Sequence, residues 1–176
     1  FVDETRQYPA KHLRQILFVK PNCFLVVDQL LPYDDKIHFY QDRWHVDTVK
    51  RTEFSPKCFT SDRGKQYDLA VVPLLTDHLT VRAVTAQRTP EMLGFRVISP
   101  LPQPATTILH ERKGRGKQIF LTLLYPYQTQ KGIPIKAIRQ LDVQAAEIEF
   151  TNGERLYVGI PDQAEQQPYF KWIPCQ

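Results

Sequence analysis

Two histidines, a tyrosine and an aspartate between residues 38 and 47 form the group in this sequence best suited to chemistry. They are His38, Tyr40, His45 and Asp47. Imidazole and carboxylate groups are ordinary zinc ligands, and a tyrosine beside a histidine can serve as an acid and base pair. On one regular strand, however, side chains alternate between faces. His38 and Tyr40 would then share one face, and His45 and Asp47 would lie on the other.

A bulge near Asp42 and Arg43 would bring this group to one side of the strand. Without a bulge, its members are ordinary polar side chains that face solvent or pack on a sheet, and we prefer this interpretation. His38, His45 and Asp47 therefore remain metal candidates only. The sequence contains no serine-histidine-aspartate signature, phosphate-binding loop or HExxH motif, so we predict no catalytic residue and no cofactor in this chain.

A second candidate site is a run of four cations within six residues. It consists of Arg112, Lys113, Arg115 and Lys117. The run lies between apolar segments at 106–109 and 118–125, which predicts that it forms the tip of a β-hairpin. Arginine forks suit bidentate contacts with sulfate or carboxylate groups, so the tip is a candidate site for an anionic glycan. The alternative is a solvated hairpin tip.

A third group is aromatic and lies in two proline-containing segments. Its members are Tyr125, Tyr127, Tyr169, Phe170 and Trp172. Exposed aromatic rings can stack on sugar faces. Beside Pro126 and Pro168, however, such rings more often anchor loops by packing.

Short strands must position all of these residues. The apolar runs 16–19 and 24–27 are rich in β-branched, aromatic and leucine side chains, which is a strand composition. Pro21 and Asn22 between them supply a turn. Because both runs are apolar on both faces, we expect them to be covered on both sides. A third strand should follow a second turn at residues 32–35 and run through His38, Tyr40 and Trp44.

The rest of the chain continues this pattern of strands and turns. The clearest local signal is Asn152-Gly153, which predicts a hairpin with a type I′ turn and Phe150 opposite Arg155. Ten or more short strands, with turns about every eight to twelve residues, predict an all-β fold, an antiparallel β-sandwich.

Length and composition fit a single β-sandwich domain over residues 1–176. Of these residues 42% are hydrophobic and 24% are charged, which is ordinary for a globular domain with a sizeable core. Fourteen prolines against seven glycines indicate many turns and few long helices. No run approaches about 18 consecutive apolar residues, so we predict no membrane-spanning segment.

Charge and cysteine content limit the partners. The net charge of +4 and the pI near 9.0 permit an acidic partner, such as an anionic polysaccharide, without demanding one. The basic residues are scattered and no recognition motif is present, so we predict no nucleic-acid partner. Cys23, Cys58 and Cys175 can form at most one disulfide, and no two of them have the spacing of a Cys-x-x-Cys metal site.

A set of short motifs is spread over about residues 8–130. The motifs are His12-x-Arg14, Ile16-Leu-Phe-Val-Lys-Pro21, Phe24-Leu-Val-Val-Asp28, His38-x-Tyr40-x-x-x-Trp44-His45, Leu93-Gly-Phe-Arg-Val97 and Ile119-Phe-Leu-Thr-Leu-Leu-Tyr-Pro126. Together they resemble strands in the C-terminal β-sheet region of heparinase II/III-like polysaccharide lyases.

This resemblance implies the function of a larger parent protein. In that family the catalytic tyrosine and a charge-neutralising asparagine or glutamine come from an α/α toroid, and the catalytic histidine and metal ligands come from the early sheet region. Both parts precede the motifs found here. The resemblance therefore implies a non-catalytic C-terminal domain whose partner is the upstream toroid of the same polypeptide. The parent would cleave uronate-containing polysaccharide by β-elimination, would be periplasmic or secreted, and would hold any divalent metal outside this chain.

Two further hypotheses remain open. One is a free-standing carbohydrate-binding module for anionic glycans, which uses the basic tip and the aromatic group. The other is an interaction scaffold. A support domain should expose an apolar patch of several hundred Å², whereas a binding module should have a concave basic or aromatic groove.

Overall fold

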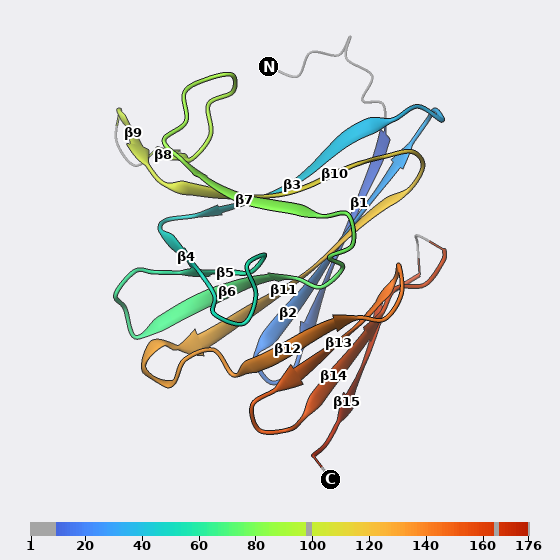
Figure 1. Cartoon of the computed structure of the whole chain (residues 1–176). Coiled ribbons are helices and arrows are strands. Elements are labelled where there is room, and N and C mark those ends of the chain that lie inside the picture. Colours follow the sequence, from blue (N-terminus) through green and yellow to red (C-terminus); the bar gives the residue numbers. More distant parts are fainter. Residues whose placement is uncertain (1–9, 98–99, 164–165, 176) are drawn as a thin grey trace.

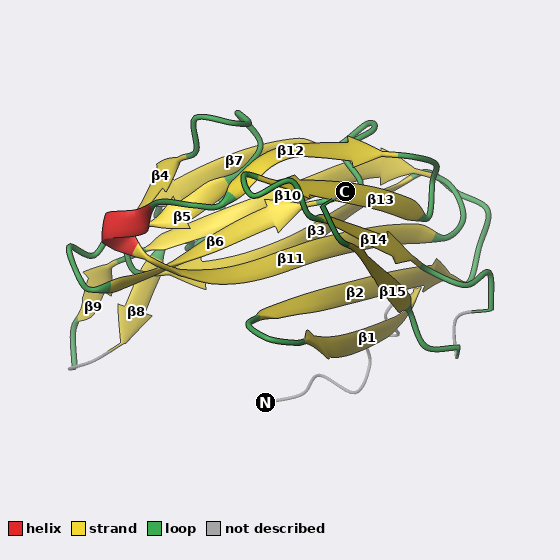
Figure 2. Cartoon of the chain, turned by 90° about the horizontal axis from the view of Figure 1, so that it is seen from below, coloured by secondary structure: helices red, strands yellow, loops and turns green. Residues whose placement is uncertain are grey.

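The computed structural model describes residues 10–97, 100–163 and 166–175, and regular structure in this part of the chain is almost entirely β (Figure 1). Figure 2 shows a helical turn, the 3-10 segment Thr129–Lys131, among the strands. All strand pairs in the sheets are antiparallel. The predicted all-β fold of many short strands is therefore confirmed. Among the described residues, no helix has the length and hydrophobicity needed to cross a bilayer.

The strands of the described residues form four sheets. The six-stranded sheet contains, in spatial order, β1 (Ala10–Val19), β2 (Cys23–Pro32), β11 (Gln118–Gln128), β6 (Tyr67–Pro73), β5 (Phe59–Ser61) and β4 (Val49–Arg51). The three-stranded sheet contains β3 (His38–Val46), β10 (Thr106–Gly114) and β7 (Thr80–Thr85). The four-stranded sheet contains β12 (Ile135–Gln140), β13 (Ala145–Phe150), β14 (Arg155–Gly159) and β15 (Tyr169–Ile173), and a small two-stranded sheet pairs β8 (Phe95–Val97) with β9 (Pro102–Pro104).

The six-stranded sheet is the middle layer, and each of its faces buries a separate core. On β6, Ala70 and Val72 belong to the main core, which is shared with the four-stranded sheet. Val71 belongs to a smaller core with Ile108 of β10 and Phe59 of β5. This division follows from the alternation of side chains along a strand. In Figure 1 the three-stranded sheet lies above the middle layer and the four-stranded sheet lies below it.

The first hairpin is present as predicted, but one face of it is not covered. β1 pairs with β2 along its whole length, down to Val19 opposite Cys23. Ile16 and Phe18 are nevertheless 63% and 50% exposed, so the expectation that both faces of the apolar run 16–19 are buried is wrong. The three-stranded sheet contacts this face of β1 at Arg14, through Asp42 of β3, but Ile16 and Phe18 lie nearer the hairpin turn and are left exposed.

The hairpin of β13 and β14, around Asn152-Gly153, has a register different from the predicted one. Glu149, and not Phe150, lies opposite Arg155. Asn152 does not have a positive φ, whereas Gly153 has a φ of 84°. A type I′ turn needs positive φ at both central residues, so this turn is not of type I′. The loop is one residue longer than the predicted two-residue loop. The Asn152 side chain accepts a hydrogen bond from the Glu154 N–H at 3.1 Å.

The predicted hairpin around the basic run is also wrong. β10 pairs with β3 and β7, whereas β11 pairs with β2 and β6. The chain between Gly114 and Gln118 therefore crosses from the three-stranded sheet to the middle layer. Strand β10 extends through Arg112 and Lys113, which places these two cations on opposite faces of a strand and not together in a loop.

Candidate functional site

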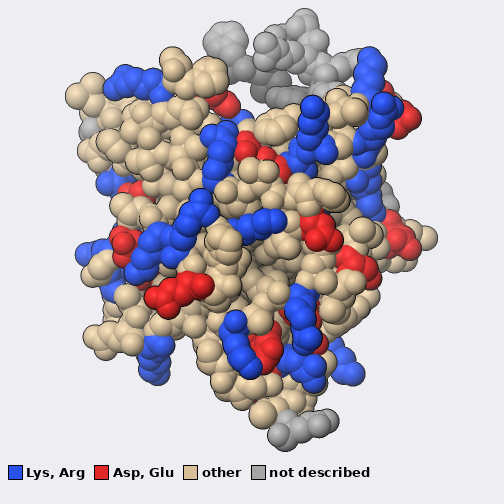
Figure 3. Space-filling view, in the orientation of Figure 1, with Lys and Arg blue, Asp and Glu red and all other residues tan. Residues whose placement is uncertain are grey.

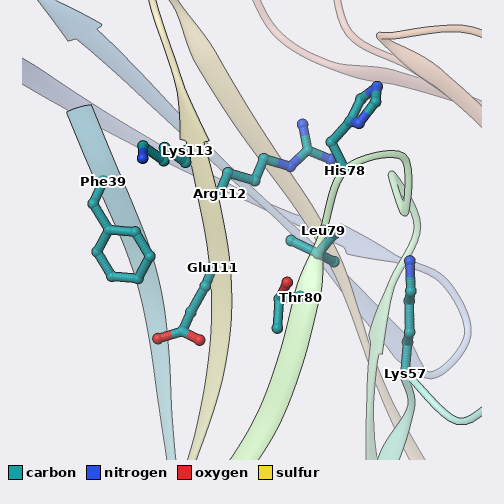
Figure 4. A pocket seen from close by; sticks show the side chains of 8 residues that line it. All are labelled: Phe39, Lys57, His78, Leu79, Thr80, Glu111, Arg112 and Lys113. Atoms are coloured by element: carbon teal, nitrogen blue, oxygen red, sulfur yellow. The ribbon is translucent and has the colours of Figure 1, made fainter. Parts of the chain in front are cut away.

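A pocket lies where β7 begins, beside β10. Thr80, the first residue of β7, pairs with Glu111, whereas β10 continues to Gly114 with β3 as its neighbour. The edge of β10 beyond Glu111 therefore has no strand on the β7 side. The pocket at this edge has a volume of about 390 Å³, which lies in the usual range for small-ligand sites, about 300–1,000 Å³. Its wall carries Lys57, His78, Arg112 and Lys113 and is completed by Phe39, Leu79, Thr80 and Glu111 (Figure 4).

Arg112 points inward from β10 and is half-buried. Its guanidinium carbon lies 5.6 Å from the centre of the Phe120 ring, and its Nη2 donates a hydrogen bond to the Leu75 carbonyl at 2.6 Å. Its Nε is buried and has no hydrogen-bond partner among the described residues. Burial lowers the pKa of the Arg112 guanidinium, because the low-dielectric surroundings disfavour its charged form.

Lys57 is a second half-buried cation, and it contacts the loop that contains Leu75 and Thr76. Its Nζ donates a hydrogen bond to the Thr76 carbonyl at 2.7 Å. The loop is held in place because the Gln140 Oε1 accepts hydrogen bonds from the N–H groups of Thr76 and Asp77, at 2.6 and 2.9 Å. His78 follows in the left-handed region, with a φ of 53°, and its exposed side chain lines the pocket.

The outer face of the three-stranded sheet supplies the other side of the pocket. Lys113 lies opposite Phe39 in the pairing of β10 with β3, and both side chains are exposed. Glu111 is the carboxylate of the wall, and it accepts hydrogen bonds from Arg82 at 2.9 and 3.0 Å and from Gln41 at 2.7 Å. Burial alone would raise the pKa of Glu111, but these hydrogen bonds outweigh it and the pKa lies below its ordinary value.

The structure divides the four cations predicted as a glycan site. Arg112 and Lys113 line the pocket. Arg115 donates a hydrogen bond to the Asp35 carbonyl at 2.8 Å and borders a smaller adjacent hollow of about 260 Å³. Lys117 points elsewhere, to the Asp162 carbonyl at 3.1 Å.

Lys57, His78 and Phe39 are pocket residues that sequence reasoning missed. They lie far from residues 112–117 in the sequence and carry no local motif. The alternation of inward and outward residues along β10 could have separated Arg112 from Lys113. Nothing in the sequence indicates which loop would meet them.

The metal candidates do not come together. β3 pairs with β10 in an unbroken register from His38 to Val46, so His38 and His45 lie on opposite faces. Each candidate has a partner of its own: His38 contacts Asp34 at 2.5 Å, His45 contacts Thr107 at 3.0 Å, and Asp47 pairs with Arg96. No group of three or more His, Cys, Asp or Glu side chains within the described ranges is arranged to hold a metal ion.

The aromatic group is mostly structural. Tyr125 and Tyr127 are buried in the main core. The Trp172 ring lies 5.3 Å from that of Phe150, and its Nε1 donates a hydrogen bond to the Lys20 carbonyl. Tyr169 and Phe170 on β15 remain exposed, but they lie at the edge of the four-stranded sheet, away from the residues that line the pocket.

A cluster of charged residues lies between the middle layer and the three-stranded sheet. The Arg14 Nε and Nη2 donate hydrogen bonds to the Asp28 carboxylate at 2.6 and 3.0 Å, and Nη2 also reaches Asp42 at 3.1 Å. His12 contacts Asp28 at 2.6 Å, and the Trp44 Nε1 donates to Asp42 at 2.7 Å. The cluster thus joins three of the lyase-like motifs, those at 12–14, 24–28 and 38–45, although they are separated in the sequence.

The charges visible in Figure 3 are mixed. Lys and Arg side chains alternate with Asp and Glu over this face and do not gather into one basic band. A nucleic-acid surface would require a continuous basic patch or stripe. The absence of a nucleic-acid partner stays a prediction.

An exposed apolar patch lies on β1 and β2, beside the ion cluster. It consists of Ile16, Phe18 and Phe24, which share one face of the hairpin because Phe18 pairs with Phe24 and Ile16 lies two residues from Phe18. The rings of Phe18 and Phe24 are 4.9 Å apart. Phe24 is 38% exposed. We refer to these three residues as the β1–β2 patch.

Comparison with known proteins finds similarity in structure but not in sequence families. No protein-family model and no curated protein sequence matches the chain. Heparan sulfate lyase HepC from Pedobacter heparinus superposes with a TM-score of 0.65 and 17% identity, and a HepC mutant superposes with a TM-score of 0.65 and 19% identity. Each match covers 88% of this chain but 24% of the lyase chain. The resemblance expected from the sequence motifs is thereby confirmed at the level of the fold.

Proposed function

We propose that this chain is the C-terminal β-sandwich region of a heparinase II/III-like polysaccharide lyase and that it supports a catalytic α/α toroid in the same polypeptide. The parent cleaves uronate-containing polysaccharide by β-elimination outside the cytoplasm. This chain supplies no catalytic residue to that reaction. The observation that carries the proposal is the fold shared with about a quarter of a heparan sulfate lyase, over 88% of this chain.

The β1–β2 patch supports a docking role. Ile16, Phe18 and Phe24 are large apolar side chains that stay exposed on an edge hairpin. Contiguous exposed apolar side chains commonly mark a surface that another structure covers. Most of the matched lyase chain lies outside the matched region, so we assign the patch to contact with the helical domain of the same polypeptide.

The test compares the complete coding sequence that contains this chain with the chain alone. Both are assayed on heparan sulfate, heparin and alginate by the ultraviolet absorbance of the unsaturated uronate product. We expect activity from the complete protein and none from the chain alone. Activity of the chain alone would overturn the non-catalytic role, and inactivity of the complete protein on every polysaccharide would overturn the lyase assignment.

A double substitution tests the docking surface. Ile16→Ser/Phe18→Ser in the complete protein should reduce activity and thermal stability, whereas the same change should leave the isolated chain folded because both side chains are exposed. Ile37→Ser/Met92→Ser is a matched control, since these apolar residues are also more than half exposed but lie outside the patch. Equal effects of the two double variants on the complete protein would exclude the β1–β2 patch as the docking surface.

One observation favours the alternative of a carbohydrate-binding module. The pocket beside β10 gathers three cations, two of them held by hydrogen bonds, and a histidine, and its volume suits a small ligand. Binding by this pocket is compatible with a support role, because the pocket residues are distinct from the β1–β2 patch.

A further inference from the structure

The three cations of the pocket have no carboxylate partner at ion-pair distance within the described residues. The described part of the chain gives Lys57, Arg112 and Lys113 no ion pair within 4.0 Å. Other cations in that part do have such pairs, including Arg14, Arg43, Arg82, Arg96, Lys136 and Arg139. Asp77 acts on the Arg112 guanidinium from a longer distance. Glu111, the acid in the wall, is already neutralised by Arg82.

Two of the three cations are held in place without being neutralised. Lys57 and Arg112 each donate a hydrogen bond to a carbonyl of one loop, that of Thr76 and that of Leu75. A carbonyl orients a cation but carries no formal charge. Burial of a cation with only such partners costs free energy. A bound anion would recover part of that cost through charge-assisted hydrogen bonds, and the unpartnered Nε of Arg112 is a remaining donor of this group.

The third cation and an aromatic ring lie side by side in the wall of the pocket. Lys113 has no polar partner among the residues that the structure describes, and its neighbour Phe39 is 61% exposed. The phenyl ring offers an apolar contact to a ring-shaped molecule. The ammonium group beside it offers a positive charge to an anionic substituent of that molecule. Figure 4 shows Arg112 directed toward His78 on one side of the wall, with Lys113 and Phe39 on the other.

We infer that this pocket binds an oxyanion-bearing saccharide, with sulfate or carboxylate groups on its sugar rings, and that Lys57 and Arg112 contact it from one side of the pocket and Lys113 and Phe39 from the other. The inference does not rest on the support role proposed above. It concerns affinity of the isolated chain, whereas the support role is tested by activity of the complete protein, so either can fail without the other.

The experiment is isothermal titration of this chain with a heparin tetrasaccharide, a tetragalacturonate and the neutral cellotetraose. We expect binding of at least one anionic saccharide and none of cellotetraose. Lys113→Glu and Lys57→Gln should each weaken binding by about tenfold or more, since each removes a charged hydrogen bond. Glutamine at position 57 keeps a donor for the Thr76 carbonyl, and position 113 is exposed, so both variants should fold.

Two further variants distinguish the pocket from general charge attraction. Lys171→Glu makes the same charge change on exposed strand β15 and should leave affinity within about twofold, since distant surface charges are screened by salt. Phe39→Ala should weaken saccharide binding severalfold. Preference for the sulfated or the carboxylated saccharide would identify the anion.

Three outcomes would overturn the inference. They are failure of both anionic saccharides to bind, equal losses for Lys113→Glu and Lys171→Glu, and binding that is unchanged in both pocket-cation variants. Circular dichroism of every variant confirms that a loss of affinity is not a loss of fold.

Discussion

Arg14 compensates the negative charges of two buried carboxylates, Asp28 and Asp42, between the sheets. Asp28 is 2% exposed and Asp42 is 5% exposed. A buried charge without a partner is expensive, and Arg14 serves both carboxylates at distances of 2.6 to 3.1 Å. Its pKa is raised chiefly by the hydrogen bond to Asp28.

Arg14→Met should therefore lower the free energy of unfolding by about 1–3 kcal/mol, less than the loss of a fully buried partner because Arg14 is itself partly exposed. Urea denaturation followed by circular dichroism measures the change. Lys136→Met, which breaks the surface pair with Glu149, is the control and should leave the free energy of unfolding nearly unchanged, because solvent screens an exposed pair. Similar losses in both variants would contradict a special role for the buried cluster.

Glu111 should make the fold sensitive to acid. Its folded-state pKa lies below the ordinary value, so its contribution to stability is present above the unfolded-state pKa of about 4.3. That contribution is lost as pH falls through the folded-state pKa. Glu111→Gln should be less stable than the parent at pH 7, and the two free energies of unfolding should converge toward pH 3. Parallel pH profiles would show that Glu111 contributes nothing pH-dependent.

At the scale of elements, the small sheet of β8 and β9 is attached by a close approach of backbones. Gly94 precedes β8, has a φ of 72° and accepts hydrogen bonds from the N–H groups of Ala86 and Ala105 at 3.0 and 2.8 Å. A Cβ at position 94 would lie 2.5 Å from the Val84 carbonyl oxygen and 2.9 Å from that of Ala105. Backbone atoms at such distances cannot move aside without breaking this attachment.

Gly94→Ala should consequently lower the free energy of unfolding by about 2–4 kcal/mol, the sum of a left-handed backbone cost and overpacking. Gly116→Ala is the matched control. Its φ of 64° is similar, but a Cβ there would meet nothing within 4 Å, so about 1 kcal/mol is expected. Chemical denaturation of both variants gives the comparison. A Gly94→Ala loss no larger than that of Gly116→Ala would exclude the steric contribution.

At the scale of the whole molecule, the main core joins the middle layer to the four-stranded sheet and contains two cysteine side chains. Cys23 and Cys58 are fully buried in it, whereas Cys175 is exposed, and none of the three forms a disulfide. Burial raises the pKa of both buried thiols to about 11. The thiolate is the reactive form, so both burial and pKa protect these thiols.

Titration with an aromatic disulfide reagent should therefore detect one thiol in the folded chain and three after denaturation. The slow reaction of the two buried thiols should follow the opening of the core. It should become faster in Arg14→Met and Gly94→Ala if these variants loosen the molecule as a whole. Three rapidly reacting thiols in the native protein would contradict the packing of the main core.

Much of this fold was predictable because strands and turns are determined locally. The hairpin of β1 and β2 follows from two apolar runs with Pro21 and Asn22 between them, and β3 follows from the next turn. Alternation along β3 also indicated that His38 and His45 would be separated, as the unbroken pairing with β10 shows. These predictions need only the period of side chains along a strand.

Tertiary structure alone decided which sheet each strand joins and which face is covered. The cations at residues 112–117 were predicted as one hairpin tip, but β10 and β11 belong to different sheets, so the group is divided. Lys57 and His78 reach the pocket from loops distant in the sequence, and Ile16 and Phe18 stay exposed because the covering sheet contacts β1 at Arg14 but leaves the turn end of the hairpin uncovered. Such outcomes depend on contacts between distant segments, whereas the sequence pattern by itself specifies only how side chains alternate along each strand.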